Sequence, residues 1–438
     1  MSLVKKGLSD SRYYLIANIG NKLLAFLIIP ILAKSVGVEE FATYDLFLVI
    51  SSFLNIVVIL GIDSGIAILL AESSDNKELS FLYLSTLIIS LLVIALLSTI
   101  FSVIFIYTDE LFLLKREIWV YIFFYVLFTM ISYHTFNFLR WRERAKEASF
   151  VTLFSYISGM LTGLLFLYFH KSVEAYLQGL IVGVFFGAIV SLYISREYIL
   201  NFKIVEDAKE RLKELLKLSL PFIPSYLGDT LMQMADRVVI LMLFGKYELG
   251  LYAIIIKLAM IPQIVLGTVT GGFLPVMLKN YNTPKGKSLI RNFFHIYLLI
   301  IPISFLIVYP ISEWAVELFG GKDFVEASYL LPMAIASILF VQSNQASGFG
   351  YYIKRKTHYI IYITFGTVAL NYIFSLILGY EIGIEGVILG TLIAGIIKTY
   401  INTLYSERLY SVEYSFKLLT LIGLFSLILS ILTSKGAL

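Results

Sequence analysis

Apolar runs of about 20 residues recur along almost the whole chain, separated by short polar segments. A helix of about 20 apolar residues crosses the ~30 Å hydrocarbon core of a membrane, so each run predicts a transmembrane helix. The pattern therefore predicts an all-α polytopic membrane protein with about twelve core helices and one further C-terminal helix. The runs lie at about residues 13–33, 41–70, 80–107, 118–139, 148–169, 175–195, 218–244, 249–278, 291–310, 326–349, 358–379, 384–404 and 415–433.

The composition agrees with this pattern. Of 438 residues, 59% are hydrophobic and 15% are charged, whereas soluble domains carry about 25% charged residues. The absence of cysteine excludes disulfides, thiol catalysis and cysteine-ligated metals. The first apolar segment has no small-residue cleavage site, so we expect a retained helix rather than a signal peptide. Because the polar segments are short, we expect no soluble catalytic domain, no cofactor and no nucleic-acid partner.

Basic residues predict the orientation in the membrane. If the N-terminus is cytoplasmic, most of the 34 Lys and Arg residues fall in cytoplasmic segments, as the positive-inside rule requires. We therefore expect a cytoplasmic N-terminus. Four basic residues lie instead within predicted spans: Lys22, Arg237, Lys257 and Lys398.

A short internal repeat predicts two related halves. The motif Gly-x-x-Glu-x-x-x-Tyr follows the first span at 37–44 and the seventh at 245–252 (245 − 37 = 208). A Glu and a Gly five residues later recur at 174–179 and 385–390 (385 − 174 = 211). Two such similar offsets at equivalent places indicate a parallel duplication of six helices.

The repeat suggests a division into domains. We expect an N-terminal six-helix lobe at 1–200, a cytoplasmic linker at 201–217, a C-terminal six-helix lobe at 218–405 and an accessory transmembrane helix at 406–438. The Glu/Lys spacing in and before the linker favours a short surface helix.

The seventh span carries a polar stripe. Ser225, Asp229, Gln233 and Asp236 recur at intervals of a helical turn, which places them on one face, with Arg237 at its margin. A charged side chain within a membrane costs several kcal/mol unless it faces a cavity or a partner. The stripe therefore indicates a functional surface.

Polar residues on other spans extend this surface, and the simplest arrangement is a water-filled cavity between the two lobes. Its cations would suit an anionic cargo, and arginine suits a phosphate in particular. Asp229 and Asp236 would suit a proton or Na⁺, together with Asn371 and Thr391 as further oxygen ligands.

Structural roles compete with these functional ones. Asp236 and Arg237 form either a structural ion pair or gate, or take part directly in transport. Being adjacent, they point about 100° apart on a helix, so only one of them needs to face a cavity. Lys22 and Lys398 either line the cavity or extend toward the membrane surface.

Two further groups favour structural roles. Asp45 and Asp63 flank the second span, where interfacial caps or loop hydrogen bonds are the favoured explanation. A ribbon of glycines favours close helix packing rather than ligand binding. These glycines are Gly159, Gly163, Gly179, Gly183 and Gly187.

Several motifs together resemble a known family. They are Leu220-Pro-x-x-Pro224, Asp236-Arg237, Gly245, Gly250-Leu-Tyr252 and Lys257, followed by Lys356-Thr357, Asn371 and Gly383-Ile-Glu-Gly386. Over residues 10–405 the chain resembles the polysaccharide-transporter family of lipid-linked oligosaccharide flippases, whose best-known members are O-antigen flippases. This family belongs to the multidrug/oligosaccharidyl-lipid/polysaccharide exporter (MOP) superfamily.

The resemblance implies a V-shaped, alternating-access transporter in the bacterial inner membrane. Such a protein moves an undecaprenyl-diphosphate-linked oligosaccharide from the cytoplasmic to the outer leaflet. The implied partners are this lipid-linked substrate, membrane lipids and other surface-glycan assembly proteins. Relatives have a cationic cavity, which implies Lys22, Arg237, Lys257 and Lys398 as head-group contacts.

The resemblance also implies coupling to H⁺ or Na⁺. A related lipid II flippase has a Na⁺ site on its seventh, eleventh and twelfth helices. The nearest matches in this chain are Asp236, Asn371 and Thr391, without the fuller set of acidic ligands.

Two other functions compete with a flippase. An organic-cation antiporter of the same superfamily should have an acidic cavity, whereas the embedded acidic and basic residues here balance. A membrane glycan polymerase or ligase should carry a large outer loop with catalytic residues, and the longest predicted outer loop, 311–325, is short and acidic. The sequence favours the flippase.

Overall fold

The computed structural model describes residues 3–73 and 75–434, while the side chains of residues 3–11 and of Asp229 lie outside the described part. The chain divides into two compact units. The first comprises Met1–Val36 and Thr43–Leu227, and the second comprises Gly37–Ala42 and Gly228–Leu438. The segment expected as a linker, 201–217, belongs to the first unit, and the division falls ten residues later, within a helix (227 − 217 = 10).

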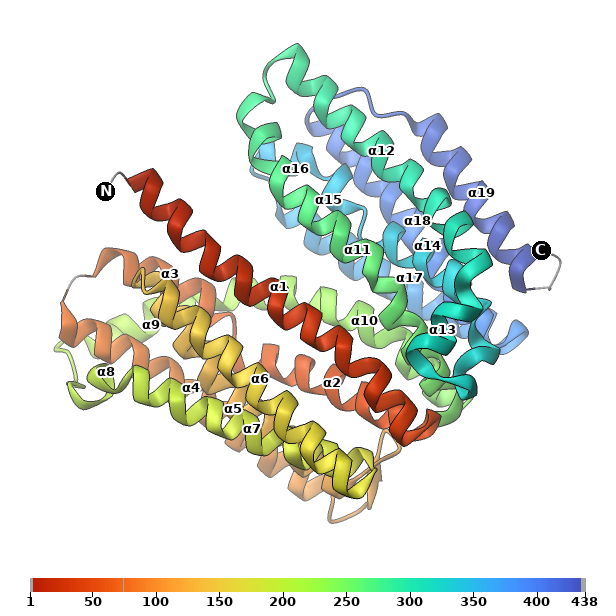
Figure 1. Cartoon of the computed structure of the whole chain (residues 1–438). Helices are drawn as coiled ribbons and strands as arrows, with labels where there is room; N and C mark the ends of the chain where they lie inside the picture. The colour runs from red at the N-terminus through yellow and green to blue at the C-terminus, as the bar shows by residue number, and fades with distance from the viewer. Residues whose placement is uncertain (1–2, 74, 435–438) are drawn as a thin grey trace. The chain divides into compact units, whose positions relative to one another are not determined.

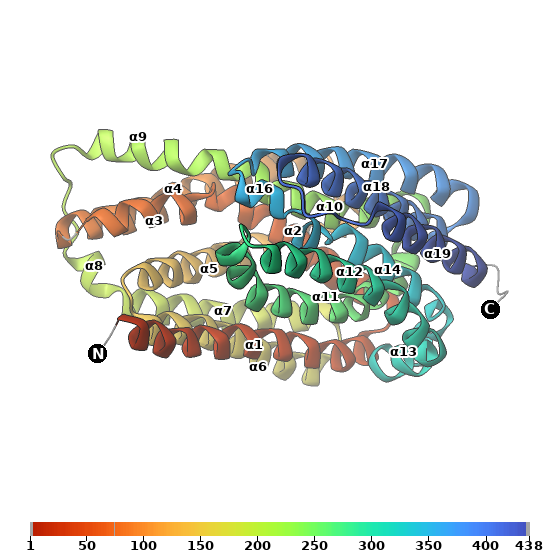
Figure 2. The same cartoon turned by 90° about the horizontal axis from the view of Figure 1, so that it is seen from above.

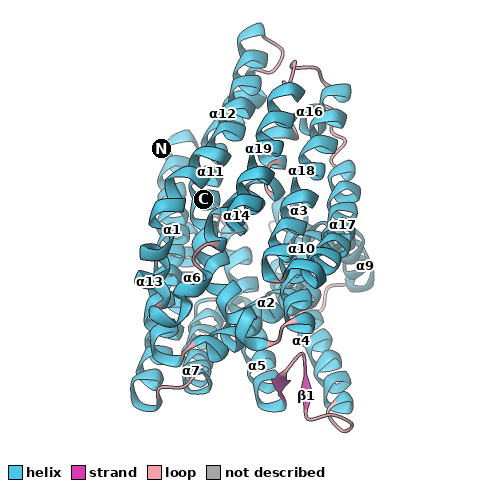
Figure 3. Ribbon diagram, turned by 90° about the vertical axis from the view of Figure 1, so that its right-hand side faces the viewer, coloured by secondary structure: helices cyan, strands magenta, loops and turns pink. Residues whose placement is uncertain are grey.

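The first unit is built from long helices and one short hairpin. Helices α6 and α7 pack along each other, and α5 and α1 pack on this pair (Figure 1). The hairpin of β1 (Glu110–Leu111) and β2 (Leu114–Lys115) connects α4 to α5 (Figure 3). The helices are α1 (Leu3–Val36), α2 (Val38–Ile59), α3 (Ile62–Glu72), α4 (Asn76–Ile104), α5 (Arg116–Trp141), α6 (Ala145–His170), α7 (Val173–Ile194), α8 (Arg196–Leu200) and α9 (Ala208–Ser219).

Small residues explain the close packing of α6 on α7. A Cβ atom added at Gly183 would lie 2.3 Å from the backbone oxygen of Ser158. The Ser158 hydroxyl donates to the Gly183 carbonyl at 2.8 Å, and the Thr162 hydroxyl donates to the Gly179 carbonyl at 2.6 Å. The prediction that the glycine ribbon serves helix packing is confirmed.

The second unit contains the remaining helices. Within it, α17 and α18 lie side by side, α14 packs on α18, and α11 packs on α14 (Figures 1 and 2). The elements are η1 (Leu220–Phe222) and α10 (Ile223–Leu243), which lead in from the first unit, then α11 (Lys246–Asn280), α12 (Pro284–Val308), η2 (Tyr309–Ile311), α13 (Ser312–Gly320), η3 (Lys322–Ala327), α14 (Leu330–Val341), α15 (Asn344–Ser347), α16 (Phe349–Ile353), α17 (His358–Ile382), α18 (Ile384–Leu409) and α19 (Phe416–Ser434).

Eleven helical segments in the described part of the chain are long and apolar enough to cross a membrane. Helix α10 and the short helices α14–α16 fall outside this set. Helix α10 carries three charged residues, Asp229, Asp236 and Arg237. Helices α14, α15 and α16 are too short, because breaks separate them from one another. The prediction of an all-α polytopic membrane protein is confirmed.

Two predicted spans are broken. The run 41–70 divides into α2 and α3 at Leu60 and Gly61, which adopt φ values of 53° and 68°. A Cβ at Gly61 would lie 2.5 Å from the Ser219 carbonyl oxygen, so this break allows the end of α9 to approach. The run 326–349 divides into η3, α14, α15 and α16. Hydrophobicity alone did not reveal either break.

The segment predicted as an outer loop, 311–325, is mostly helical. This segment forms α13 and most of η3, with a turn at Gly321, where φ is 91°. Trp314 and Leu318 are exposed on α13, which gives this helix the apolar surface of a segment that lies at or in the membrane.

The repeated motif builds the same turn twice. Gly37 follows α1 with φ 80°, and Gly245 follows α10 with φ 86°. A glycine adopts such positive φ values without a steric cost, and the glutamate of each copy, Glu40 or Glu248, lies in the first turn of the next helix. The two sequence copies therefore encode equivalent helix connections.

Candidate functional site

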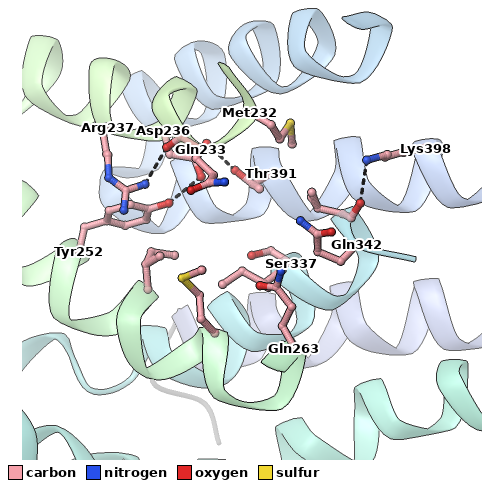
Figure 4. A pocket seen from close by; sticks show the side chains of 14 residues that line it. Met232, Gln233, Asp236, Arg237, Tyr252, Gln263, Ser337, Gln342, Thr391 and Lys398 are labelled. Atoms are coloured by element: carbon pink, nitrogen blue, oxygen red, sulfur yellow. Dashed lines mark hydrogen bonds between the residues drawn. The ribbon is translucent and has the colours of Figure 1, made fainter. Parts of the chain in front are cut away.

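The second unit contains a polar cavity of about 80 Å³ (Figure 4). Four elements surround it: α10, α11, the end of α14 and α18. A water molecule needs roughly 10–15 Å³ of such volume, so the cavity has room for several waters or for a phosphate-sized group. The polar lining residues are Gln233, Asp236, Arg237, Tyr252, Gln263, Ser337, Gln342, Thr391 and Lys398.

Asp236 lies at the centre of a hydrogen-bond network. The Asn371 amide and the Thr391 hydroxyl each donate to its Oδ1 atom at 2.8 Å. The Tyr252 hydroxyl donates to its Oδ2 atom at 2.6 Å. Asp236 is 6% exposed, and a buried carboxylate is stable only when such donors or a cation compensate its lost hydration.

A second layer of contacts orients these donors. The Ser375 hydroxyl lies 3.1 Å from both Asn371 Oδ1 and the Val387 carbonyl oxygen. The Thr391 hydroxyl also lies 3.1 Å from that carbonyl. Gly390 lets α18 approach α17 here, because a Cβ at this position would lie 2.5 Å from the Ser375 nitrogen. Close packing of α17 on α18 therefore builds the network.

Two cations line the same cavity. Arg237 donates from Nη1 to the Gln233 carbonyl, one turn earlier on α10, at 2.6 Å, and its guanidinium lies 5.9 Å from the Tyr252 ring centroid. Lys398 donates from Nζ to the Val341 carbonyl at 2.8 Å, where α14 ends (Figure 4). Both side chains are less than a tenth exposed. Lys398 therefore does not extend to the membrane surface.

The cavity has a positive formal charge. Its charged lining residues are Asp236, Arg237 and Lys398, which sum to +1. Three neutral donors and the charge of the adjacent Arg237 compensate the negative charge of Asp236. A cavity with this balance is suited to an anion.

The structure brings together most of the residues predicted for the site. Asp236, Asn371 and Thr391 are in direct contact, and Arg237 and Lys398 share their cavity. Only one of the adjacent Asp236 and Arg237 needed to face a cavity, and both line this one. The long Arg237 side chain bends back along α10 toward Gln233. Its guanidinium therefore reaches the cavity, although the two residues point about 100° apart on the helix.

Two predicted residues, Lys257 and Lys22, are not among the described residues that line this cavity. Lys257 is half-buried on α11 and its ammonium lies 5.9 Å from the Phe41 ring centroid. Lys22 is an exposed residue of α1 in the first unit, so its place in a shared cavity stays a prediction. The side chain of Asp229 lies outside the described part of the chain.

Tyr252 is the most important residue that the sequence did not assign to the site. Its ring is 1% exposed and its hydroxyl donates to Asp236. In the sequence Tyr252 belongs to the repeated motif and to the motif Gly250-Leu-Tyr252, but neither motif assigns it to the site. Gln263, Ser337 and Gln342 were also missed, since single polar residues on long apolar helices give no signal of a common target.

Asp63 in the first unit accepts hydrogen bonds from other helices, which agrees with the structural role that the sequence favours. The Tyr133 hydroxyl donates to its Oδ2 atom at 3.0 Å, and the Tyr226 hydroxyl lies 3.3 Å from the same atom. These bonds tie the first turn of α3 to α5 and to the first turn of α10. Asp45, in contrast to its predicted place at an interface, is fully buried within α2.

The network includes oxygen atoms that suit a monovalent cation. They are contributed by Asp236, Asn371, Ser375, Thr391 and the Val387 carbonyl. One carboxylate supplies a single negative charge, which fits H⁺ or Na⁺ better than a divalent ion. Asn371 presents its amide nitrogen to Asp236 and its oxygen to Ser375. Cation binding would require this amide to turn.

Comparison with solved structures identifies the fold. The chain matches a structure described as an inward-facing multidrug resistance MATE family transporter of the MOP superfamily, with a TM-score of 0.68 and 15% identity, over 91% of this chain and 95% of the other. It matches the lipid II flippase MurJ in an inward closed conformation with a TM-score of 0.70 and 19% identity, over 96% and 91%. The chain is therefore a polytopic membrane protein with the fold of the MOP superfamily.

Sequence comparison identifies the family. A family model described as polysaccharide biosynthesis protein matches residues 8–281, and the chain belongs to this family. The capsular polysaccharide biosynthesis protein CapF of Staphylococcus aureus is 26% identical over 342 residues, which cover 76% of this chain and 82% of CapF. The resemblance found in the sequence motifs is confirmed.

Proposed function

We propose that this protein is a flippase for an undecaprenyl-diphosphate-linked oligosaccharide, such as an O-antigen or a similar surface-glycan repeat unit. It moves this lipid from the cytoplasmic to the outer leaflet of the bacterial inner membrane, with its own N-terminus in the cytoplasm. Its family, the name of CapF and the name of MurJ support a lipid-linked glycan as the cargo.

The observation that carries this proposal is the net positive cavity formed by Asp236, Arg237 and Lys398. A diphosphate carries the complementary charge, and a guanidinium can bind two phosphate oxygens at once. Removing both partners from water strengthens their attraction. The cavity is the proposed site of one phosphate group.

The size of the cavity limits what it can hold. Its volume of about 80 Å³ has room for a phosphate-sized group but not for a whole oligosaccharide within it. In the proposed mechanism the head-group phosphate binds at Arg237 and Lys398, the glycan lies outside this cavity, and the polyprenyl chain stays in the lipid. This division explains how one protein would accept glycans of different sequence.

The Asp236 network is the proposed coupling site. A proton or Na⁺ bound at Asp236 removes its negative charge, which raises the net charge of the cavity from +1 to +2 and strengthens phosphate binding. Release of the ion reverses this effect. Ion and substrate would thus bind with positive cooperativity.

Reconstitution in liposomes tests this function. Purified protein receives a fluorescent lipid-linked oligosaccharide, and its appearance in the opposite leaflet is measured with and without Na⁺ and proton gradients. We expect flipping that one of the two gradients accelerates. Export of cationic dyes, without flipping of the lipid-linked substrate, would identify a drug transporter instead and overturn the proposal.

A further inference from the structure

A second cavity lies in the first unit and shares no lining residue with the polar cavity. It is a groove of about 440 Å³ between α4, α5 and Phe105. Its wall is apolar or aromatic along most of its length, and Arg116 is the one charged residue among its described lining residues. The other lining residues are Leu91, Ile94, Ala95, Ser98, Phe101, Ser102, Trp119, Val120, Phe123, Phe124 and Leu127.

The two serines do not make the groove polar. Ser98 donates to the Ala95 carbonyl at 2.9 Å, and Ser102 donates to the Ser98 carbonyl at 2.7 Å. Their hydroxyl hydrogens are used by the helix itself. The wall therefore suits a hydrocarbon chain rather than a polar ligand.

The groove is preformed by stacked aromatic rings. The rings of Phe101 and Trp119 stack with centroids 4.6 Å apart, and Phe101 contacts Phe123 edge-on at 5.4 Å. The Trp119 indole donates to the Leu111 carbonyl at 3.1 Å, which ties the ring to the hairpin. A rigid wall of this kind loses little conformational entropy when a ligand binds.

The groove is open on a face that the protein does not cover. Only 17% of the membrane-crossing window of α4 is buried, so most of this apolar helix is exposed and can contact lipid. From Arg116 to Leu127 the groove follows α5 for roughly 16 Å at 1.5 Å per residue, which is about half of the ~30 Å hydrocarbon core. It therefore extends through the depth of one leaflet.

Arg116 lies at the end of the groove where a lipid phosphate would be. It is exposed and begins α5, and none of the described side chains forms an ion pair with it. The neighbouring Lys115, in contrast, lies opposite Glu110 in the hairpin. No side chain caps the N-terminus of α5, whose N–H groups also favour an anion.

We propose that this groove binds an anionic phospholipid, with one acyl chain between α4 and α5 and the phosphate at Arg116. The site is separate from the proposed transport cavity, and its occupant is a resident lipid rather than the cargo. The proposal does not depend on the flippase function.

Tryptophan fluorescence tests the site directly, because Trp119 forms part of its wall. The chain has three tryptophans, so the variant W141F/W314F leaves Trp119 as the only emitter. This protein is placed in phosphatidylcholine vesicles that contain an equal fraction of brominated phosphatidylglycerol or brominated phosphatidylcholine. We expect phosphatidylglycerol to compete for the groove about fivefold better than phosphatidylcholine, because a single basic residue supplies the preference.

Four variants in this background define the result. R116Q should lower quenching by the anionic lipid to the level of the neutral one, whereas K115Q should leave the preference in place. A95F should fill the groove and reduce quenching by both lipids, while L96F, on the same exposed face but outside the lining, should not. Equal quenching by the two lipids in the starting protein would overturn the proposal. So would anionic-lipid quenching that undecaprenyl phosphate abolishes at a low mole fraction, because the groove would then hold a polyprenyl chain.

Discussion

Asp236 is a buried carboxylate held by three different helices. Tyr252 on α11, Asn371 on α17 and Thr391 on α18 all donate to it from positions far apart in the sequence. Each bond to a charged acceptor contributes about 1.5–3 kcal/mol. The network therefore both positions the carboxylate and joins α10 to three other helices of the second unit.

Removal of the Tyr252 hydroxyl tests the contribution of one donor. In Y252F the Oδ2 atom of Asp236 loses its 2.6 Å hydrogen bond within a buried site, and we expect a destabilisation of about 1–3 kcal/mol. The measurement is thermal unfolding of purified protein in detergent. Y247F is the matched control, because Tyr247 donates a similar bond to Glu326 at the exposed surface, where the loss should be below about 1 kcal/mol. Equal losses in the two variants would contradict a special role for the buried network.

The sequence predicted part of this site and missed part of it. Asp236, Asn371 and Thr391 were grouped correctly because the family resemblance placed polar residues of three helices at one ion site. Tyr252 was missed because a tyrosine on an apolar helix looks the same whether its hydroxyl meets a carboxylate or a membrane interface. The three-dimensional contact, which decides between these roles, has no local signature.

At the scale of elements, helix pairs are fixed by small residues. The pairs α6–α7 and α17–α18 both rely on glycines whose Cβ atoms would overlap the partner backbone. These contacts keep helices close in a membrane, where no hydrophobic effect drives them together. Helix pairs of this kind are suited to move as rigid bodies.

A methyl group added at one of these glycines tests the packing. In G183A the new Cβ would lie 2.3 Å from the Ser158 carbonyl oxygen, so α6 and α7 must separate, and we expect a loss of about 1–3 kcal/mol. The control is G366A on α17, where nothing lies within 4 Å of the added atom. Stability is measured by thermal unfolding of the purified variants. A G183A protein as stable as G366A would show that the contact is not needed.

The element boundaries show where sequence patterns fail. The predicted span 41–70 contains a real break at Leu60–Gly61, and the predicted loop 311–325 is helical. Apolar runs report which segments lie in the membrane, because hydration sets that preference. A break depends instead on what packs against it, here the end of α9, and a run of apolar letters does not contain that information.

At the scale of the whole molecule, the orientation in the membrane is still a prediction. The chain contains no cysteine, so single cysteines can report the side of each loop. Lys285 should face the cytoplasm and Lys322 the outside. We expect a membrane-impermeant maleimide to label K322C in intact spheroplasts and K285C only after lysis. The reverse labelling would invert the predicted topology.

The flippase proposal requires both the fold of the whole chain and a binding site within one cavity. Alternating access requires two states that differ in which side the substrate site faces. The polysaccharide biosynthesis family and the MOP fold are consistent with such a cycle, and the positive cavity is the proposed cargo-binding site. The account therefore depends most on whether Arg237 and Lys398 act on the substrate.

The most direct test is the rate of lipid-linked oligosaccharide flipping by the double variant R237Q/K398Q in liposomes. Each lost charge-assisted bond is worth at least about 1.4 kcal/mol, so we predict a rate at least about tenfold below that of the wild type. K279Q/K285Q is the matched control, because it removes two positive charges from exposed positions of the same unit, and it should flip at the wild-type rate. Thermal unfolding confirms that both proteins are folded. Flipping by a folded R237Q/K398Q protein at the wild-type rate would contradict the proposal that this cavity binds the cargo.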